Sequence, residues 1–148
     1  QLLTDQQFVR AEVWARMLPN YTDSADALII IGSSYFYRGA MNEAEGYFKQ
    51  AYDVNPTDYA AYWYGRVFLV RGKTDQAVLL LKEAIRKTSS NVAIAWYLRE
   101  LGTAYAQTGR CIDAYAAYDL ALQRDPAPDN MKRIAIARAA STASCSIH

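Results

Sequence analysis

The chain has 148 residues, of which 52% are hydrophobic, enough for a single domain with a substantial core. It carries 16 lysines and arginines against 15 aspartates and glutamates, so the net charge is about +1. This balance disfavours nucleic acid and anionic membrane surfaces as partners, and no apolar run is long enough to insert into a membrane.

The two cysteines, Cys111 and Cys145, lie far apart and do not form a CxxC pair. A domain of this size does not need a disulfide scaffold, so we expect free thiols. The chain begins at Gln1 rather than at methionine, which favours an excised or processed segment. These features do not fix the cellular compartment of the protein, and we favour the cytoplasm.

Residues 1–24 are predicted to form an N-terminal helix and a linker. The helix covers residues 4–18, where Thr4 and Gln7 have the spacing of a capping box, and Pro19 ends it. Two placements stay open: the helix packs onto the segment that follows, or it is the last helix of a preceding repeat. It could also fold over the ligand groove discussed below.

Three segments then repeat one pattern, over residues 25–57, 58–94 and 95–128. Small and bulky residues recur at constant offsets: Gly32, Gly65 and Gly102; then Gly39, Gly72 and Gly109; then Ala44, Ala77 and Ala114; then Phe48, Leu81 and Tyr118; and last Ala51, Ala84 and Ala121. Each unit is predicted to be two helices joined by a turn whose glycine adopts a positive φ. One such pair cannot bury its apolar face alone, so the units are expected to stack into a solenoid.

The first unit, ALIIIGSSYFYRGAMNEAEGYFKQAYDVNP, resembles a tetratricopeptide repeat (TPR). Its motif places are filled by Leu28, Ile31, Gly32, Tyr35, Ala44, Phe48, Ala51 and Pro56. The third unit matches comparably, with Leu98, Leu101, Gly102, Tyr105, Ala114, Tyr118, Ala121 and Pro126, and the second matches more loosely, with Ala61, Tyr64, Gly65, Phe68, Ala77, Leu81, Ala84 and Ser89. The resemblance implies an all-α, right-handed α-α superhelix of three helix-turn-helix repeats that binds proteins and uses no cofactor.

The spacing of the units departs from strict regularity. Gly65 and Gly102 are 37 positions apart, whereas Gly32 and Gly65 are 33 apart. We therefore expect one additional turn at the start of the third unit, capped by Ser90 or Asn91. Residues 129–148 are predicted to form a capping helix and tail, with Met131, Ile134, Ala135 and Arg138 on one side, Lys132 and Arg133 on the other, and residues 144–148 disordered.

Helical angles divide the aromatic side chains into two sets. Tyr64 and Phe68 fall on the packing side of their helix. A second set falls on the concave side, where the resemblance places the ligand groove: Phe36, Tyr37, Tyr59, Tyr62, Arg66, Trp96, Arg99 and Thr103, with Trp63 on its flank. Tyrosine, tryptophan and arginine are enriched at interface hot spots, so these residues are the predicted partner-binding site. The alternative is that aromatics at helical spacing are core, or are covered by a terminal helix.

In some members of the family, lysine, asparagine and arginine side chains clamp the C-terminal carboxylate of a chaperone. Here the corresponding places hold Ile29, Ser33, Trp63, Trp96 and Glu100, so this clamp is absent. The expected ligand is another protein, bound as an extended or helical peptide with apolar residues and an acidic one, the latter meeting Arg66 and Arg99.

No catalytic or metal-binding residues are predicted. The sole histidine, His148, is the final residue, and no HExxH, GxSxG, phosphate-loop or zinc spacing occurs. We therefore expect a non-enzymatic protein-interaction module. The alternatives are a self-associating scaffold or homo-oligomer, a secretion-type chaperone of similar layout, and a regulatory domain cut from a larger protein.

Overall fold

The computed structural model describes residues 2–145, with side chains from Gln6 onward. The helices are α1 (Leu2–Met17), α2 (Ala25–Tyr37), α3 (Met41–Val54), α4 (Asp58–Val70), α5 (Thr74–Lys87), α6 (Asn91–Gln107), α7 (Cys111–Arg124) and α8 (Pro128–Cys145), with a 3-10 turn, η1 (Tyr21–Asp23), between the first two. No strand occurs between residues 2 and 145, and the predicted all-α class is confirmed.

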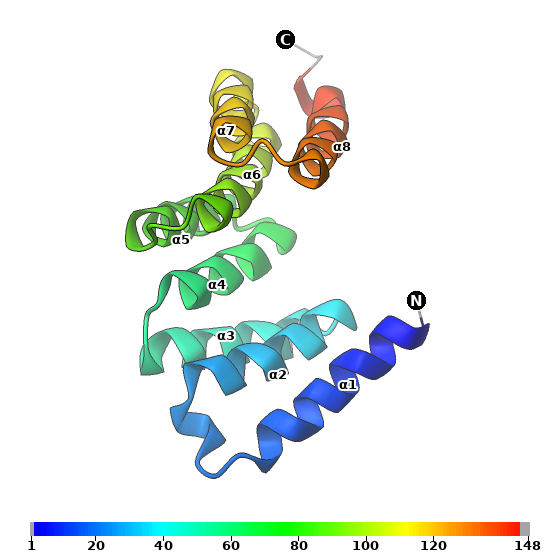
Figure 1. The fold of residues 1–148 in the computed structure, drawn as a ribbon, viewed down its shortest axis with the longest axis vertical. Coiled ribbons are helices and arrows are strands. Elements are labelled where there is room, and N and C mark those ends of the chain that lie inside the picture. The colour runs from blue at the N-terminus through cyan, green and yellow to red at the C-terminus, as the bar shows by residue number, and fades with distance from the viewer. Residues whose placement is uncertain (1, 146–148) are drawn as a thin grey trace.

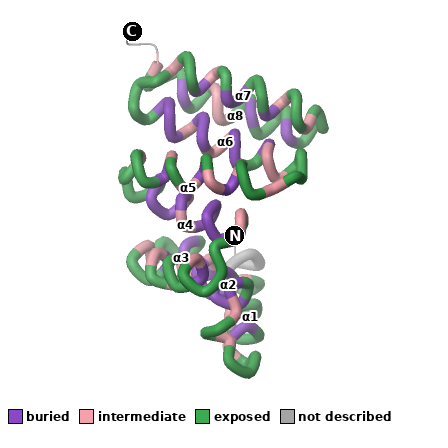
Figure 2. Tube along the Cα trace, turned by 90° about the vertical axis from the view of Figure 1, so that its left-hand side faces the viewer, coloured by how far each residue is buried: buried purple, intermediate pink, exposed green. Residues whose placement is uncertain are grey.

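The helices form three stacked pairs, α2 with α3, α4 with α5 and α6 with α7, in a right-handed α-α superhelix (Figure 1). The first helix, α1, lies alongside α2 at one end of the stack, and α8 lies against α6 and α7 at the other. Buried residues run through the middle of the stack, and exposed residues lie on the outer turns (Figure 2). The stacking follows from sequence, because each pair leaves an apolar face for its neighbour.

Side-chain caps set the starts of the first helices of the three pairs. The hydroxyls of Ser24, Thr57 and Ser90 accept hydrogen bonds from backbone N–H groups three residues later, at 3.2, 3.1 and 3.3 Å. The cap at Ser90 confirms the expected additional turn, since α6 has 17 residues while α2 and α4 have 13 each.

Glycines are required at two kinds of place. Gly39, Gly72 and Gly109 end the first helix of each pair with φ of +80°, +76° and +75°, as predicted. Within the pairs, a Cβ on Gly102 would lie 2.6 Å from the ring of Tyr118, and one on Gly32 would lie equally close to Phe48. Glycine therefore lets a ring from the second helix lie directly against the backbone of the first.

The first helix packs onto the repeat that follows it. Ala15 is buried with Ala27 and Ile31 of α2. The Glu12 carboxylate accepts hydrogen bonds from Arg16 and from Arg38 at the end of α2, at 2.9 and 2.6 Å. The helix begins at Leu2, so Thr4 lies inside it and the predicted capping box is wrong, while the side chain of Thr4 lies outside the described residues.

The last helix differs from the predicted capping helix in its buried face. Ile134 is buried and Arg138 pairs with Asp119 of α7, as the predicted face requires, but Met131 and Ala135 are exposed. Asn130, Ala137 and Ser141 also face α6 and α7. The helix continues to Cys145, so the predicted disorder is wrong for residues 144 and 145, and residues 146–148 lie outside the described part.

The prediction of free thiols is wrong. Cys111 at the start of α7 and Cys145 at the end of α8 form a disulfide, with an S–S distance of 2.10 Å and Cα atoms 5.7 Å apart. Since α7 and α8 pack side by side, the two ends meet although 34 positions separate them. The bond ties α8 to the last repeat.

Across the described residues, none of the helices combines the length and apolar character needed to cross a bilayer.

Candidate functional site: the inner face of α2, α4 and α6

The predicted groove residues divide by exposure. Tyr37, Tyr59 and Trp96 are exposed, at 44%, 43% and 41%. Arg66, Arg99 and Thr103 are half-buried, while Phe36 and Tyr62 are buried. We call the accessible six the inner face: Tyr37, Tyr59, Arg66, Trp96, Arg99 and Thr103. Phe36 and Tyr62 belong to the layer beneath this face.

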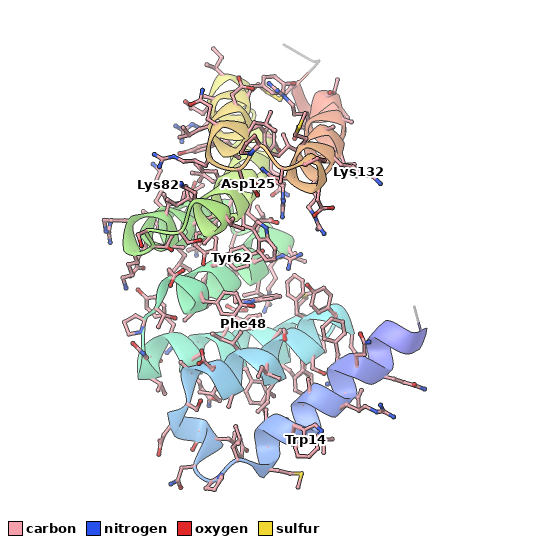
Figure 3. The ribbon with its side chains drawn as sticks, in the orientation of Figure 1. Trp14, Phe48, Tyr62, Lys82, Asp125 and Lys132 are labelled. Atoms are coloured by element: carbon pink, nitrogen blue, oxygen red, sulfur yellow. A yellow bond between two sulfur atoms is a disulfide. The ribbon has the colours of Figure 1, made fainter. Side chains whose placement is uncertain are left out.

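Trp63 is the centre of that supporting layer. Its ring lies 5.3 Å from Phe48, which sits between α3 and α4, and 5.7 Å from Phe36 (Figure 3). Tyr59 and Tyr62 also contact it, at 6.2 and 5.6 Å. The predicted flanking position of Trp63 is therefore a core position, and its indole N–H has no acceptor among the described residues.

Tyr62 joins α4 to α6. Its ring lies 4.9 Å from that of Tyr97, whose hydroxyl donates to the Asp58 carboxylate at 2.7 Å. Burial raises the pKa of the Tyr62 hydroxyl above its ordinary value. Tyr62 is thus a structural contact between neighbouring repeats, and it positions Tyr59, which stacks on it at 6.3 Å.

Arg66 is held among aromatic rings. Its guanidinium donates to the Tyr37 hydroxyl at 3.2 Å and lies 5.0 Å from the ring centroid of Phe36 and 5.1 Å from that of Trp63. Burial lowers its pKa, but Glu100 and two nearby tyrosines together raise it by more, so the net shift is upward. Arg66 is a fixed positive charge on the inner face.

Arg99 and Thr103 extend the inner face along α6. The Arg99 guanidinium lies 5.9 Å from the Trp96 ring and donates to the Asn130 side-chain oxygen at 3.4 Å. The Thr103 hydroxyl donates to the Arg99 carbonyl at 3.2 Å and lies 3.1 Å from the Tyr118 hydroxyl. These contacts fix the side chains of α6 against α7 and α8.

A pocket of about 330 Å³ opens between α4, α6 and α8. Three predicted residues, Arg66, Arg99 and Thr103, line one side of it. Glu100 of α6 and Arg133 and Ile136 of α8 also line it, with Ala137 and Ala140, and the sequence did not place them in the site. The hydrophobic pattern of α8 does not predict this, because two residues on its buried face, Asn130 and Ser141, are polar.

Phe8 of α1 is another residue that sequence reasoning missed. Its ring stacks on Tyr37 at 4.3 Å with an interplanar angle of 19°, so α1 reaches the edge of the inner face. Tyr37 nevertheless stays exposed, so α1 supports this face without covering it.

In the described part of the chain, no three histidine, cysteine or acidic side chains lie close enough together to hold a metal ion.

Comparison with known proteins supports the repeat architecture. A crystal structure of MamA aligns with a TM-score of 0.63 and 24% identity over 71% of this chain and 60% of the other. A second MamA structure gives the same TM-score and identity, and the chain spans 56% of its length. The N-terminal domain of stress-induced protein-1 (STI-1) from C. elegans aligns with a TM-score of 0.65 and 16% identity, over 82% of this chain and 99% of that domain.

The comparison with curated protein sequences gives no significant match. The sequence profile of the tetratricopeptide repeat family matches residues 31–92 and 65–130, which together span most of the three pairs. The glycine offsets, the paired helices and this match agree, and the chain belongs to the tetratricopeptide repeat family.

Proposed function

We propose that the chain is a non-enzymatic protein-interaction module that binds a peptide or helix of a partner protein on its inner face. The observation that carries this proposal is the exposure of Tyr37, Tyr59 and Trp96 on the first helices of three successive repeats. Large aromatic rings that remain accessible beside arginines are typical of interface hot spots. Phe36 and Tyr62 contribute by holding these rings in place.

Two observations favour binding over catalysis. The Cys111 sulfur is bonded to that of Cys145 and is therefore not available as a nucleophile. The carboxylate of Glu45, close to Glu43 in the sequence, is paired with Arg71 and Lys73 of the next repeat. The chemistry that remains on the inner face is recognition through rings and guanidinium groups.

Selection from a random twelve-residue peptide library on the intact chain tests the proposal. Peptides that bind the wild type should lose roughly tenfold or more affinity for Tyr59→Ala and for Trp96→Ala. Trp14→Ala is the matched control, since Trp14 is exposed on α1, away from the inner face. Equal affinity for all four proteins would show that the inner face is not the binding site.

Self-association is a second candidate, because α1 and the residue after it expose several apolar side chains: Val9, Val13, Trp14, Met17 and Leu18. Exposed apolar patches of this kind mark contact surfaces. Sedimentation at several protein concentrations separates the candidates. An apparent mass that rises with concentration for the wild type, and that is lower for Trp14→Ala, supports self-association.

We further propose that the module works in an oxidising compartment rather than in the cytoplasm, where thiols are kept reduced. The Cys111–Cys145 disulfide supports this, because such bonds persist in secreted and periplasmic proteins.

A further inference from the structure

The pocket between α4, α6 and α8 has more positive than negative charge. Three guanidinium groups line it, from Arg66, Arg99 and Arg133, against one carboxylate, that of Glu100. Arg133 also forms an ion pair with Asp129 on the exposed side of α8, at 3.0 Å. The pocket therefore keeps a net positive charge in a chain whose overall charge is only about +1.

Arg66 and Arg99 differ from most ordered arginines of the protein in their partners. Arg38, Arg71 and Arg138 each lie within 4.0 Å of a carboxylate, and so do Arg16 and Arg110. Within the described part of the chain, neither Arg66 nor Arg99 has such a partner, although both are half-buried. Glu100 stabilises the Arg66 charge without forming an ion pair, so both guanidinium groups keep N–H donors that can pair with an incoming anion.

The guanidinium groups are also held in place before any ligand arrives. Arg66 is fixed by the Tyr37 hydroxyl and two rings, and Arg99 by Asn130 and Trp96. Pre-ordered side chains lose little conformational entropy on binding, and a planar guanidinium matches a carboxylate through two parallel hydrogen bonds. The exposed Ile136 beside them offers an apolar contact to the residue next to the acid.

We propose that this pocket binds a carboxylate group of the partner peptide, through Arg66, Arg99 and Arg133. The inference rests on the proposed function and adds to it the chemistry of the ligand. It also makes α8 part of the binding site, because Arg133 and Ile136 complete the pocket. The carboxylate comes either from an aspartate or glutamate side chain or from the C-terminus of the peptide.

The library selection described above also tests this inference. The selected peptides should be enriched in aspartate and glutamate, or should require a free C-terminus. Resynthesis of the best peptide with glutamine at the acidic position, and separately with a C-terminal amide, distinguishes the two sources. The form that loses the critical carboxylate should bind roughly tenfold to a hundredfold more weakly.

Two variants of α8 provide a matched pair. Arg133→Gln should weaken binding of the acidic peptide roughly tenfold and reduce its salt dependence, while having no effect on the glutamine or amide form. Lys132→Gln removes the same charge from the neighbouring residue, which points away from α6 and α7, and should leave affinity unchanged (Figure 3). Arg99→Gln should behave like Arg133→Gln.

The outcomes separate the two proposals. Peptides that depend on Tyr59 and Trp96 but show neither acidic enrichment nor dependence on a free C-terminus overturn the pocket inference and leave the proposed function standing. Equal losses of peptide affinity in Arg133→Gln and Lys132→Gln also overturn the pocket inference, because the change in net charge would then explain the loss. A library that yields no binder overturns both.

Discussion

The hydroxyls of Tyr118 and Ser141 lie 2.9 Å apart in a buried hydrogen bond that joins α7 to α8. Ser141 also donates to the Ala137 carbonyl at 2.8 Å, and the Tyr118 hydroxyl lies 3.1 Å from that of Thr103 on α6. One phenol thus links the last three helices.

Tyr118→Phe should lower the free energy of unfolding by about 1–2 kcal/mol, because it leaves the Ser141 and Thr103 hydroxyls short of a buried partner. Thermal unfolding followed by circular dichroism should show a melting temperature lower by about 2–4 °C per kcal/mol. Tyr59→Phe, at an exposed ring, is the control. An equal melting temperature for both variants would contradict the role of this hydrogen bond.

Gly102 and Gly65, which both face the second helix of their pair, should respond differently to alanine. Gly102→Ala places a Cβ 2.6 Å from the hydrogen-bonded ring of Tyr118, so overpacking should destabilise the protein by about 1–3 kcal/mol. Gly65→Ala meets Leu80 and Leu81 at 3.2 and 3.3 Å and the Ala77 carbonyl oxygen at 3.4 Å, and the higher helix propensity of alanine should offset that crowding to within about 1 kcal/mol. Urea unfolding measures both, and a larger loss for Gly65→Ala would refute the argument.

Glu12→Ala should loosen α1 from α2. The carboxylate accepts from Arg38 and Ser34 of the first repeat as well as from Arg16, so its removal takes one acceptor from each of those donors. Hydrogen exchange of the backbone amides of residues 8–17 should become faster, while exchange in α4 and α6 stays unchanged. Glu43→Ala, at an exposed position of α3, is the control, and equal exchange in both variants would count against the network.

Glu83 should make stability depend on pH in the acid range. Burial raises the pKa of its carboxyl, but hydrogen bonds from Lys87 and Tyr52 lower it by more, so it lies below its ordinary value of 4.5. A lowered folded-state pKa contributes stability above 4.5 that is lost as pH falls through the folded value.

The wild type should therefore exceed Glu83→Gln in stability at pH 7, and the difference should shrink below pH 4.5. Urea unfolding at both ends of this range gives the comparison. A difference that is constant with pH would show that the carboxylate charge is not involved.

Loss of the disulfide should destabilise the last repeat. The bond closes a loop of 34 positions, for which chain entropy predicts about 4 kcal/mol of stabilisation. Cys111→Ser/Cys145→Ser, or addition of a reductant to the wild type, should lower the urea midpoint, and reductant should not affect the double variant. Thiol titration of the unfolded, unreduced protein should detect no free thiol; two thiols would refute the bond.

The repeat organisation could be predicted because glycine and alanine at constant offsets report helix contacts within each pair. The burial of Phe36 and Tyr62 could not. Helical angle assigns a side chain to a face of one helix, but Tyr62 is buried by Tyr97 of the next repeat, and Phe36 by the Arg66 guanidinium and Trp63. Such contacts depend on how closely neighbouring repeats stack, which no single helix encodes.

The disulfide and the α8 wall of the pocket were missed for a related reason. Cys111 and Cys145 meet because α7 and α8 form an antiparallel pair, and that pairing was assigned only to the three repeats. An antiparallel arrangement of α7 and α8 brings the start of α7, with Cys111, next to the end of α8, with Cys145. Asn130 and Ser141, two polar residues on the buried face of α8, obscured that arrangement.

The Cys111–Cys145 bond also makes the two ends of the described repeat array differ in their resistance to unfolding. Stacked repeats lose structure from their ends, where a helix pair has one neighbour instead of two. Here the C-terminal end is a covalent ring that contains α7 and α8, so it cannot peel away one helix at a time. Among the described helices, we therefore expect α7 and α8, and with them Arg133, to open last.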